Sequence, residues 1–238
     1  MKMKKLTWYH SMGFYNNPFS IKPSAFSNEV IGYSQLTKGL KSKVANGEVI
    51  FIFGEYGTGK TTFLNDVLSD YKGKKQAIYY NCDIGDRSID YDKLLIGAGG
   101  FLGRLFRIRK KNMIILLDEA HYLNNKDMEQ LKNYYDNGFF KSIIFVSTQK
   151  NPKLTKELDS LIGKNRFSLE GIGKAEAVEL VRQRIGKLKF ISDQSISQIF
   201  SKDRNIRAFL KNCEDVCRHA FEHGADFVSE EHIEEVLG

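Results

Sequence analysis

The stretch GEYGTGKTT, Gly54–Thr62, limits the possible folds of this chain more than any other feature, because it directly follows the apolar run VIFIF. It fits the pattern G-x-x-x-x-G-K-[ST], which requires a strand before it and a helix after it. Glycines let backbone N–H groups curl around phosphate oxygens, where side chains would obstruct them. The pattern therefore predicts a phosphate-binding loop formed by Gly54, Glu55, Tyr56, Gly57, Thr58, Gly59, Lys60, Thr61 and Thr62.

A second apolar run ends in two acids, in the stretch MIILLDEAH at residues 113–121. We expect Asp118 to hold a magnesium shell with the Thr61 hydroxyl, while Lys60 reaches the outer phosphates. Glu119 is expected to orient an attacking water. The letters DEAH also occur in helicases with two tandem motor domains, for which 238 residues are too few, so His121 is expected to support its neighbours or the fold. The two motifs together predict ATP and Mg²⁺ as cofactors.

Strands alternate with helices as far as residue 170, and two of the predicted helices span residues 60–72 and 90–108. The apolar runs are VIFIF, QAIYYN, NMIILLD, SIIFVSTQ and the short NRFSL, and strands of this kind are typical of a parallel sheet covered on both faces. After residue 170 four helical patterns follow with no strand signal. The predicted parts are an N-terminal extension at 1–29, an α/β nucleotide-binding domain at 30–170 and a helical domain at 171–238.

With both motifs in place, the chain resembles the AAA+ ATPases over about residues 28–238. Within them it is similar to the branch of replication initiators, transposition ATPases and secretion-type ATPases, and GFYNNPFSIKPSAF followed by VIGYSQLTKGL is similar to the opening of the secretion-type group. The resemblance implies an AAA+ P-loop core of class α/β, with a parallel five-stranded sheet in the order 5-1-4-3-2 flanked by helices. It also implies a C-terminal all-helical lid domain and an adenine pocket at Val30, Ile31 and Gly32.

The resemblance implies three further catalytic positions, each with an alternative. They are a polar sensor after the fourth strand (Gln149, or Thr148), an arginine finger (Arg166, or Lys164) and a lid arginine near the γ-phosphate (Arg207, or Arg204). An arginine supplied to a neighbouring subunit's nucleotide raises the rate by roughly 10³–10⁵. The implied assembly is an ATP-dependent homo-oligomer, as a ring or a filament.

Cations crowd before the third strand, in GRLFRIRKKN, and the whole chain carries a formal charge of +7. Such a cluster can follow a DNA backbone, so the candidate nucleic-acid contacts are Arg104, Arg107, Arg109, Lys110 and Lys111. The first functional hypothesis is therefore an ATPase that drives DNA binding, loading or remodelling. The alternative is an ATPase switch that binds a protein partner through GAGGFLGRLF and no nucleic acid; a solvated loop is the plainest interpretation of the cluster.

Several other classes are not expected. No apolar run approaches the roughly 18–20 residues that span a bilayer, and the basic N-terminus lacks the apolar segment of a signal peptide. The chain has three cysteines and no Cys-x-x-Cys pair, and Cys213 and Cys217 fit a buried helix face. This cysteine usage indicates a reducing compartment, so the predicted location is the cytoplasm.

Overall fold

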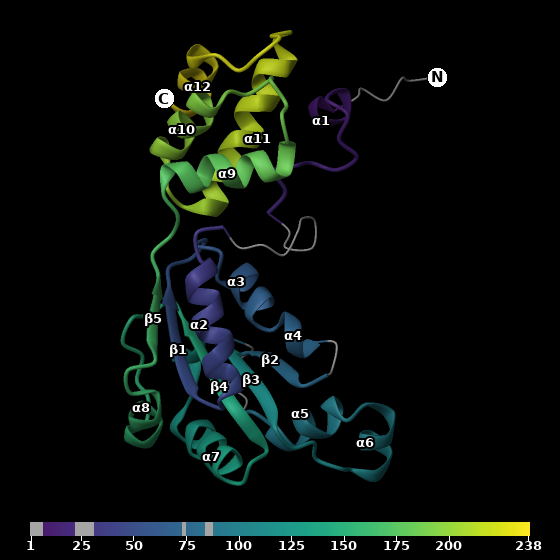
Figure 1. Cartoon of the computed structure of the whole chain (residues 1–238), viewed down its shortest axis with the longest axis vertical. Coiled ribbons are helices and arrows are strands. Elements are labelled where there is room, and N and C mark those ends of the chain that lie inside the picture. Colours follow the sequence, from purple (N-terminus) through teal and green to yellow (C-terminus); the bar gives the residue numbers. More distant parts are fainter. Residues whose placement is uncertain (1–6, 22–30, 73–74, 84–87) are drawn as a thin grey trace. The chain divides into compact units, whose positions relative to one another are not determined.

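The computed structural model describes residues 7–21, 31–72, 75–83 and 88–238 (Figure 1). The chain divides into two compact units. One contains residues 33–56 and 63–170, and the other contains 171–238 with residues 57–62 and the described residues up to Gly32. The predicted boundaries at residues 29 and 170 stay a prediction.

The first unit is built on one sheet of five parallel strands. The sheet order is β2-β3-β4-β1-β5, which confirms the predicted order 5-1-4-3-2. The strands are β1 (Val49–Gly54), β2 (Ala77–Asn81), β3 (Met113–Asp118), β4 (Phe140–Ser147) and β5 (Arg166–Leu169).

Position in the sheet explains the composition of the strands. The central strands β1, β3 and β4 are buried almost throughout, and their residues are nearly all apolar because helices cover both faces. The edge strands β2 and β5 pair on one side only and carry exposed polar positions, including Tyr79 and Arg166. All five strands are parallel, so their carboxyl ends lie along one edge of the sheet.

The helices of the first unit pack on both faces of the sheet. On one face α2 contacts β1 and β4, and on the other α7 and α8 join α5 in the apolar core around β1, β3 and β4 (Figure 1). The helices are α2 (Ser34–Ala45), α3 (Lys60–Val67), α4 (Ser69–Lys72), α5 (Tyr91–Ala98), α6 (Gly100–Phe106), α7 (Asn125–Asp136) and α8 (Lys156–Ile162), with a 3₁₀ turn, η2 (Ala120–Tyr122).

Two predicted helices are each divided in the structure. The helix expected at 60–72 breaks at Leu68 into α3 and α4, and the helix expected at 90–108 breaks at Gly99 into α5 and α6. At the second break the backbones approach closely: a Cβ on Gly103 would lie 2.9 Å from the Ile96 carbonyl oxygen. The glycines of GAGGFLG therefore let α6 fold back on α5, which a continuous helix would not allow.

The C-terminal region is helical, as predicted. Serine or asparagine side chains cap three of its helices by accepting bonds from their first N–H groups, which fixes where these helices begin. No described helix of the chain is long and apolar enough to cross a membrane. The helices are α9 (Lys174–Ile185), α10 (Asp193–Lys202), α11 (Ile206–Glu222) and α12 (Glu230–Leu237).

Residues 7–21 pack against these C-terminal helices. They contain the short helix α1 (Trp8–Ser11), and Trp8 and Phe19 lie in the same apolar core as α9, α10 and α11. The two rings stack with their centroids 5.6 Å apart. Arg184 of α9 donates hydrogen bonds to the carbonyl oxygens of Pro18 (3.2 Å) and Ser20 (3.0 Å), and burial lowers the pKa of its guanidinium to about 10. We call residues 7–21 the N-terminal arm.

Candidate functional site

The loop after β1 has the backbone that the sequence motif predicts. Gly57 and Gly59 have φ angles of +85° and +88°, a conformation that glycine adopts readily and other residues rarely. A Cβ on Gly57 would overlap the side-chain amide of Asn205, which lies in the same compact unit. Lys60 is the first residue of α3, so the loop leads into the N–H groups of a helix N-terminus. A glycine loop that leads into a helix N-terminus fits the phosphates of a nucleotide.

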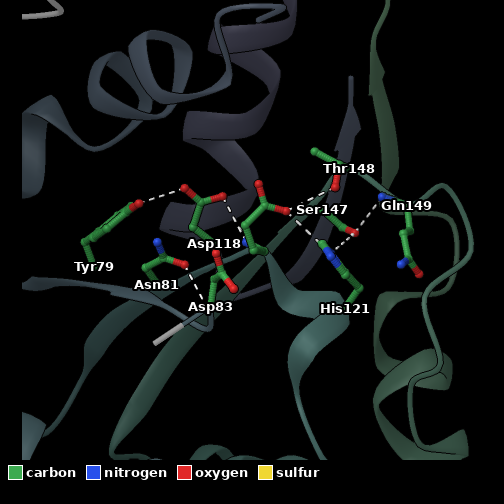
Figure 2. Close-up of polar contacts among 9 residues, drawn as sticks. Tyr79, Asn81, Asp83, Asp118, His121, Ser147, Thr148 and Gln149 are labelled. Carbon is green, nitrogen blue, oxygen red and sulfur yellow. Dashed lines mark hydrogen bonds and ion pairs between the residues drawn. The ribbon is translucent and has the colours of Figure 1, made fainter. Parts of the chain in front are cut away.

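Asp118 is the last residue of β3, and a donor holds each of its carboxylate oxygens (Figure 2). Oδ1 accepts a hydrogen bond from the backbone N–H of Glu119 at 3.0 Å, and Oδ2 accepts one from the Tyr79 hydroxyl at 2.7 Å. The described residues contain no group of three or more histidine, cysteine or acidic side chains that could hold a metal ion. A single carboxylate fits magnesium, which proteins usually bind through one or two carboxylates together with substrate phosphates.

Glu119 has an unusual backbone and its own set of contacts. Its φ is +51°, in a left-handed region that costs non-glycine residues about 1–3 kcal/mol, and strained residues of this kind cluster at functional sites. Its Oε2 accepts a hydrogen bond from Thr148 Oγ1 at 3.1 Å and lies 3.5 Å from His121 Nδ1. His121 Nδ1 also lies 3.1 Å from Ser147 Oγ, at the end of β4 (Figure 2). The end of β4 therefore supports the glutamate, directly and through His121.

The two candidates for the polar sensor differ in their contacts. Thr148 is half-buried and its side chain contacts Glu119, whereas Gln149 is exposed and reaches the cluster through its backbone N–H, which donates to Ser147 Oγ at 2.9 Å. β4 ends at Ser147, so the residue that immediately follows the strand is Thr148. The sensor role of Gln149 stays a prediction, and the observed geometry favours Thr148.

The predicted adenine pocket lies only partly within the described structure. Val30 is outside the described residues. Gly32 has a φ of +84°, and a Cβ on it would lie 3.1 Å from Ile172 Cγ2 and 3.2 Å from Glu176 Oε1, so no larger residue fits there without displacing these groups. The proposed contact of Ile31 and Gly32 with a base stays a prediction.

The predicted arginine finger is held by its own chain. Arg166 opens β5, forms an ion pair with Asp159 of α8 and lies over the Phe51 ring, 5.1 Å from its centroid. Lys164, the alternative cation, is exposed. In the lid, Arg207 lies in the first turn of α11 and its backbone N–H bonds the capping Asn205. Arg207 and its alternative Arg204 are both exposed, and the roles of all four cations stay predictions.

The five cations proposed for nucleic acid fall into two groups. Three of them contact other residues of the protein. Arg109 forms an ion pair with Asp92 at 3.2 Å, Lys110 donates a hydrogen bond to the Lys75 carbonyl oxygen at 2.7 Å, and the Lys111 ammonium lies 5.4 Å from the centroid of the Phe139 ring. The remaining two, Arg104 and Arg107, are exposed and form no ion pair with any described residue.

Around these two arginines lies an exposed apolar surface. In Figure 1, α6 lies farther from the sheet than α5. We call α6 and the two residues that follow it the α6 surface. Its exposed apolar residues are Phe101, Leu105, Phe106 and Ile108. Exposed large apolar side chains that gather on one helix make it a candidate interaction site.

Sequence reasoning did not anticipate Tyr79. The stretch QAIYYN predicts a strand, and its alternation indicates which residues share a face, but not which neighbour the phenol would meet. The pairing of β2 with β3 places Tyr79 opposite Leu116 and Asn81 opposite Asp118, on one face of the sheet. The aromatic residue two positions before the end of this edge strand was the available signal.

A sequence model of the AAA domain family matches residues 46–170, more than half of the chain. The protein therefore belongs to the AAA family, as the two motifs predicted. A search of curated proteins finds no match.

Solved structures share the fold at low sequence identity. Cdc6p from Pyrobaculum aerophilum matches with a TM-score of 0.68 and 17% identity over 92% of this chain and 70% of that one. The RuvB Holliday junction branch migration motor of Thermotoga maritima gives 0.66 and 17%, over 87% and 69%. A chain of Drosophila ORC bound to DNA matches with a TM-score of 0.64 and 14% identity over 93% of this protein. The match spans only 63% of the length of that ORC chain.

Proposed function

We propose that this protein is an ATP hydrolase that assembles with copies of itself and uses ATP and Mg²⁺ to drive DNA binding, loading or remodelling. The observation that carries the proposal is the pair of acids at the carboxyl end of β3, each held by separate donors. Ligands of open α/β sheets bind outside the carboxyl ends of the strands, and in the sequence the glycine loop begins at Gly54, the last residue of β1.

Each residue of the site has a distinct part in the proposed reaction. The loop N–H groups and Lys60 hold the phosphates, and Thr61 and Asp118 hold the magnesium shell. Magnesium, when bound, neutralises charge on the phosphates. Thr148 and His121 contact Oε2 of Glu119, which leaves Oε1 as the oxygen to accept a hydrogen bond from the attacking water.

The remaining proposed catalytic residues act at the edge of the site. Arg166 would stabilise the transition state of a neighbouring subunit, and to do so it must exchange Asp159 for a phosphate. Arg207 would contact the γ-phosphate from the lid, and Gln149 or Thr148 would sense it. A homo-oligomer follows from the sharing of Arg166 between subunits.

The DNA proposal is tested by measuring ATP hydrolysis with and without duplex DNA over a range of protein concentrations. We expect stimulation by DNA and a specific activity that rises with concentration as subunits assemble. Glu119→Gln should bind ATP and DNA but turn over slowly, because the water loses its acceptor carboxylate. If turnover of Glu119→Gln equals that of the parent, Glu119 does not have this role.

Salt dependence and a charge-matched control test the DNA contact itself. If Arg104 and Arg107 each contact one phosphate, affinity per subunit should fall roughly tenfold between 50 and 200 mM salt. Replacing both by alanine should abolish most of this dependence. The control removes the same charge from exposed lysines elsewhere, Lys126→Ala with Lys141→Ala, and should leave it intact. An absence of DNA binding at low salt with ATP present would exclude the DNA function.

One observation supports the second candidate, an ATPase switch that acts on a protein partner. Three of the five proposed DNA contacts are engaged on the protein's own surface, while the α6 surface exposes several large apolar side chains. Apolar anchors next to arginines are typical of the energetic centres of protein interfaces. In that case Leu105→Ser would impair function as severely as removal of both arginines, and DNA would not alter ATP hydrolysis.

A further inference from the structure

Tyr79 joins an edge strand to the proposed magnesium residue. It lies in the middle of β2, which pairs with β3 alone, and its side chain is 54% exposed. An exposed tyrosine on a sheet edge would ordinarily point its hydroxyl into solvent. Here the hydroxyl instead donates a hydrogen bond of 2.7 Å to Asp118 Oδ2 (Figure 2).

The strand register explains how the phenol reaches the carboxylate. Tyr79 and Asn81 lie on one face of β2, and Asn81 is opposite Asp118. The tyrosine ring therefore extends along that face from two residues upstream. A phenol keeps its proton at neutral pH, so the hydroxyl donates this hydrogen bond and the carboxylate accepts it.

The hydrogen bonds of Asp118 leave its carboxylate able to bind a cation. The Tyr79 hydroxyl donates a hydrogen bond to Oδ2 and the Glu119 backbone N–H donates one to Oδ1, so each oxygen has one of these donors. A carboxylate has about four lone-pair sites, so acceptor capacity remains on both oxygens. The two donors fix the orientation of the group without occupying it fully.

The two acids are thus supported by opposite neighbours of β3. Asp118 is held from β2 by Tyr79, and Glu119 is held from the end of β4 by Thr148. If the two acids act on different parts of the reaction, loss of each support should produce a different defect.

We propose that Tyr79 is a positioning residue that orients the Asp118 carboxylate toward the magnesium of a bound nucleotide. The inference rests on the proposed function of this site. Removal of a residue that hydrogen-bonds to a metal ligand typically lowers metal affinity by about 10–100-fold. The proposal therefore assigns Tyr79 an effect on metal affinity, separate from the affinity for the nucleotide alone.

The test is Tyr79→Phe, which removes only the hydroxyl. Binding of Mn²⁺, as a spectroscopic substitute for Mg²⁺, is measured by electron paramagnetic resonance with a non-hydrolysable ATP analogue present. We expect affinity for Mn²⁺ to fall about 10-fold or more. Affinity for a fluorescent ATP analogue in EDTA should remain unchanged, because the loop that holds the phosphates is intact.

Two further variants separate positioning from a general effect on the fold. Tyr80→Phe removes a hydroxyl from the adjacent residue, on the other face of β2, and should bind Mn²⁺ as the parent does. Thr148→Val removes the donor to Glu119, and should slow turnover at saturating Mg²⁺ while leaving Mn²⁺ affinity intact.

Each outcome is decisive. Unchanged Mn²⁺ affinity in Tyr79→Phe would overturn the role of Tyr79 while leaving the proposed ATPase function standing. An equal loss of nucleotide affinity in EDTA would also overturn it, because the residue would then support the fold rather than the metal. If the parent protein binds no Mn²⁺ with the nucleotide, the proposed function itself fails.

Discussion

Phe19→Ala should destabilise the compact unit of the C-terminal helices, because the N-terminal arm forms part of its core. The Phe19 ring is 1% exposed and stacks on Trp8, so the substitution removes a fully buried ring and leaves a cavity. Substitutions of this kind cost about 3–5 kcal/mol. The matched control is Phe101→Ala, which removes the same atoms from a ring that is 78% exposed on α6, and should cost no more than about 0.5 kcal/mol.

Hydrogen exchange measures this difference within the unit. Amides of α9 and α11 that exchange through opening of the unit should exchange roughly 100- to 3000-fold faster in Phe19→Ala, since each 1.4 kcal/mol changes an opening equilibrium tenfold. Amides of β3 and β4, in the other unit, serve as an internal reference. Equal protection of α11 in both variants would refute the reasoning, because the arm would then contribute nothing to the helical core.

Three further predictions concern single side chains. Lys60→Ala should lose most nucleotide affinity in a titration with a fluorescent ATP analogue, because the loop loses its charge; unchanged affinity would contradict the phosphate-loop assignment. Arg166→Ala and Lys60→Ala should regain ATPase activity when mixed, since each supplies the half of a shared site that the other lacks; no recovery would indicate Lys164 or a site within one subunit. Burial raises the pKa of the Cys82 thiol from 9.0 to about 12, so at pH 8 its thiolate fraction is about 10³-fold lower than that of an exposed cysteine. Because the thiolate is the reactive form, alkylation of Cys82, followed by mass spectrometry, should be slower by about the same factor. Alkylation of Cys82 in the folded protein as fast as that of a free thiol would contradict its burial.

The sheet was predictable because its signals are local. Each central strand is a nearly continuous apolar run, and the glycine loop after the first run identified the family and with it the strand order. The division of residues 90–108 into two helices was not predictable in the same way. The sequence shows that Gly99 and Gly103 weaken a helix. It does not show that α6 packs so closely on the Ile96 carbonyl of α5 that a side chain at position 103 would not fit.

The contacts within the site depend on register and on long-range packing. Asp118 and Glu119 were identified from their place after an apolar run, but their partners come from strands β2 and β4, whose alignment the sequence does not specify. Thr148 and Gln149 are adjacent, so only the observed end of β4 distinguishes them. The N-terminal arm is the extreme case, because Trp8 and Phe19 pack with helices near the other end of the chain.

That last contact has a consequence for synthesis on the ribosome. Trp8 and Phe19 are translated long before α11, which lies in the same core and ends at Glu222. At about 5–20 residues per second, the two rings wait roughly 10–40 s before their partners exist. During this interval they are exposed apolar groups on a growing polypeptide, and the core that they share with α11 can close only after roughly 200 further residues have been translated.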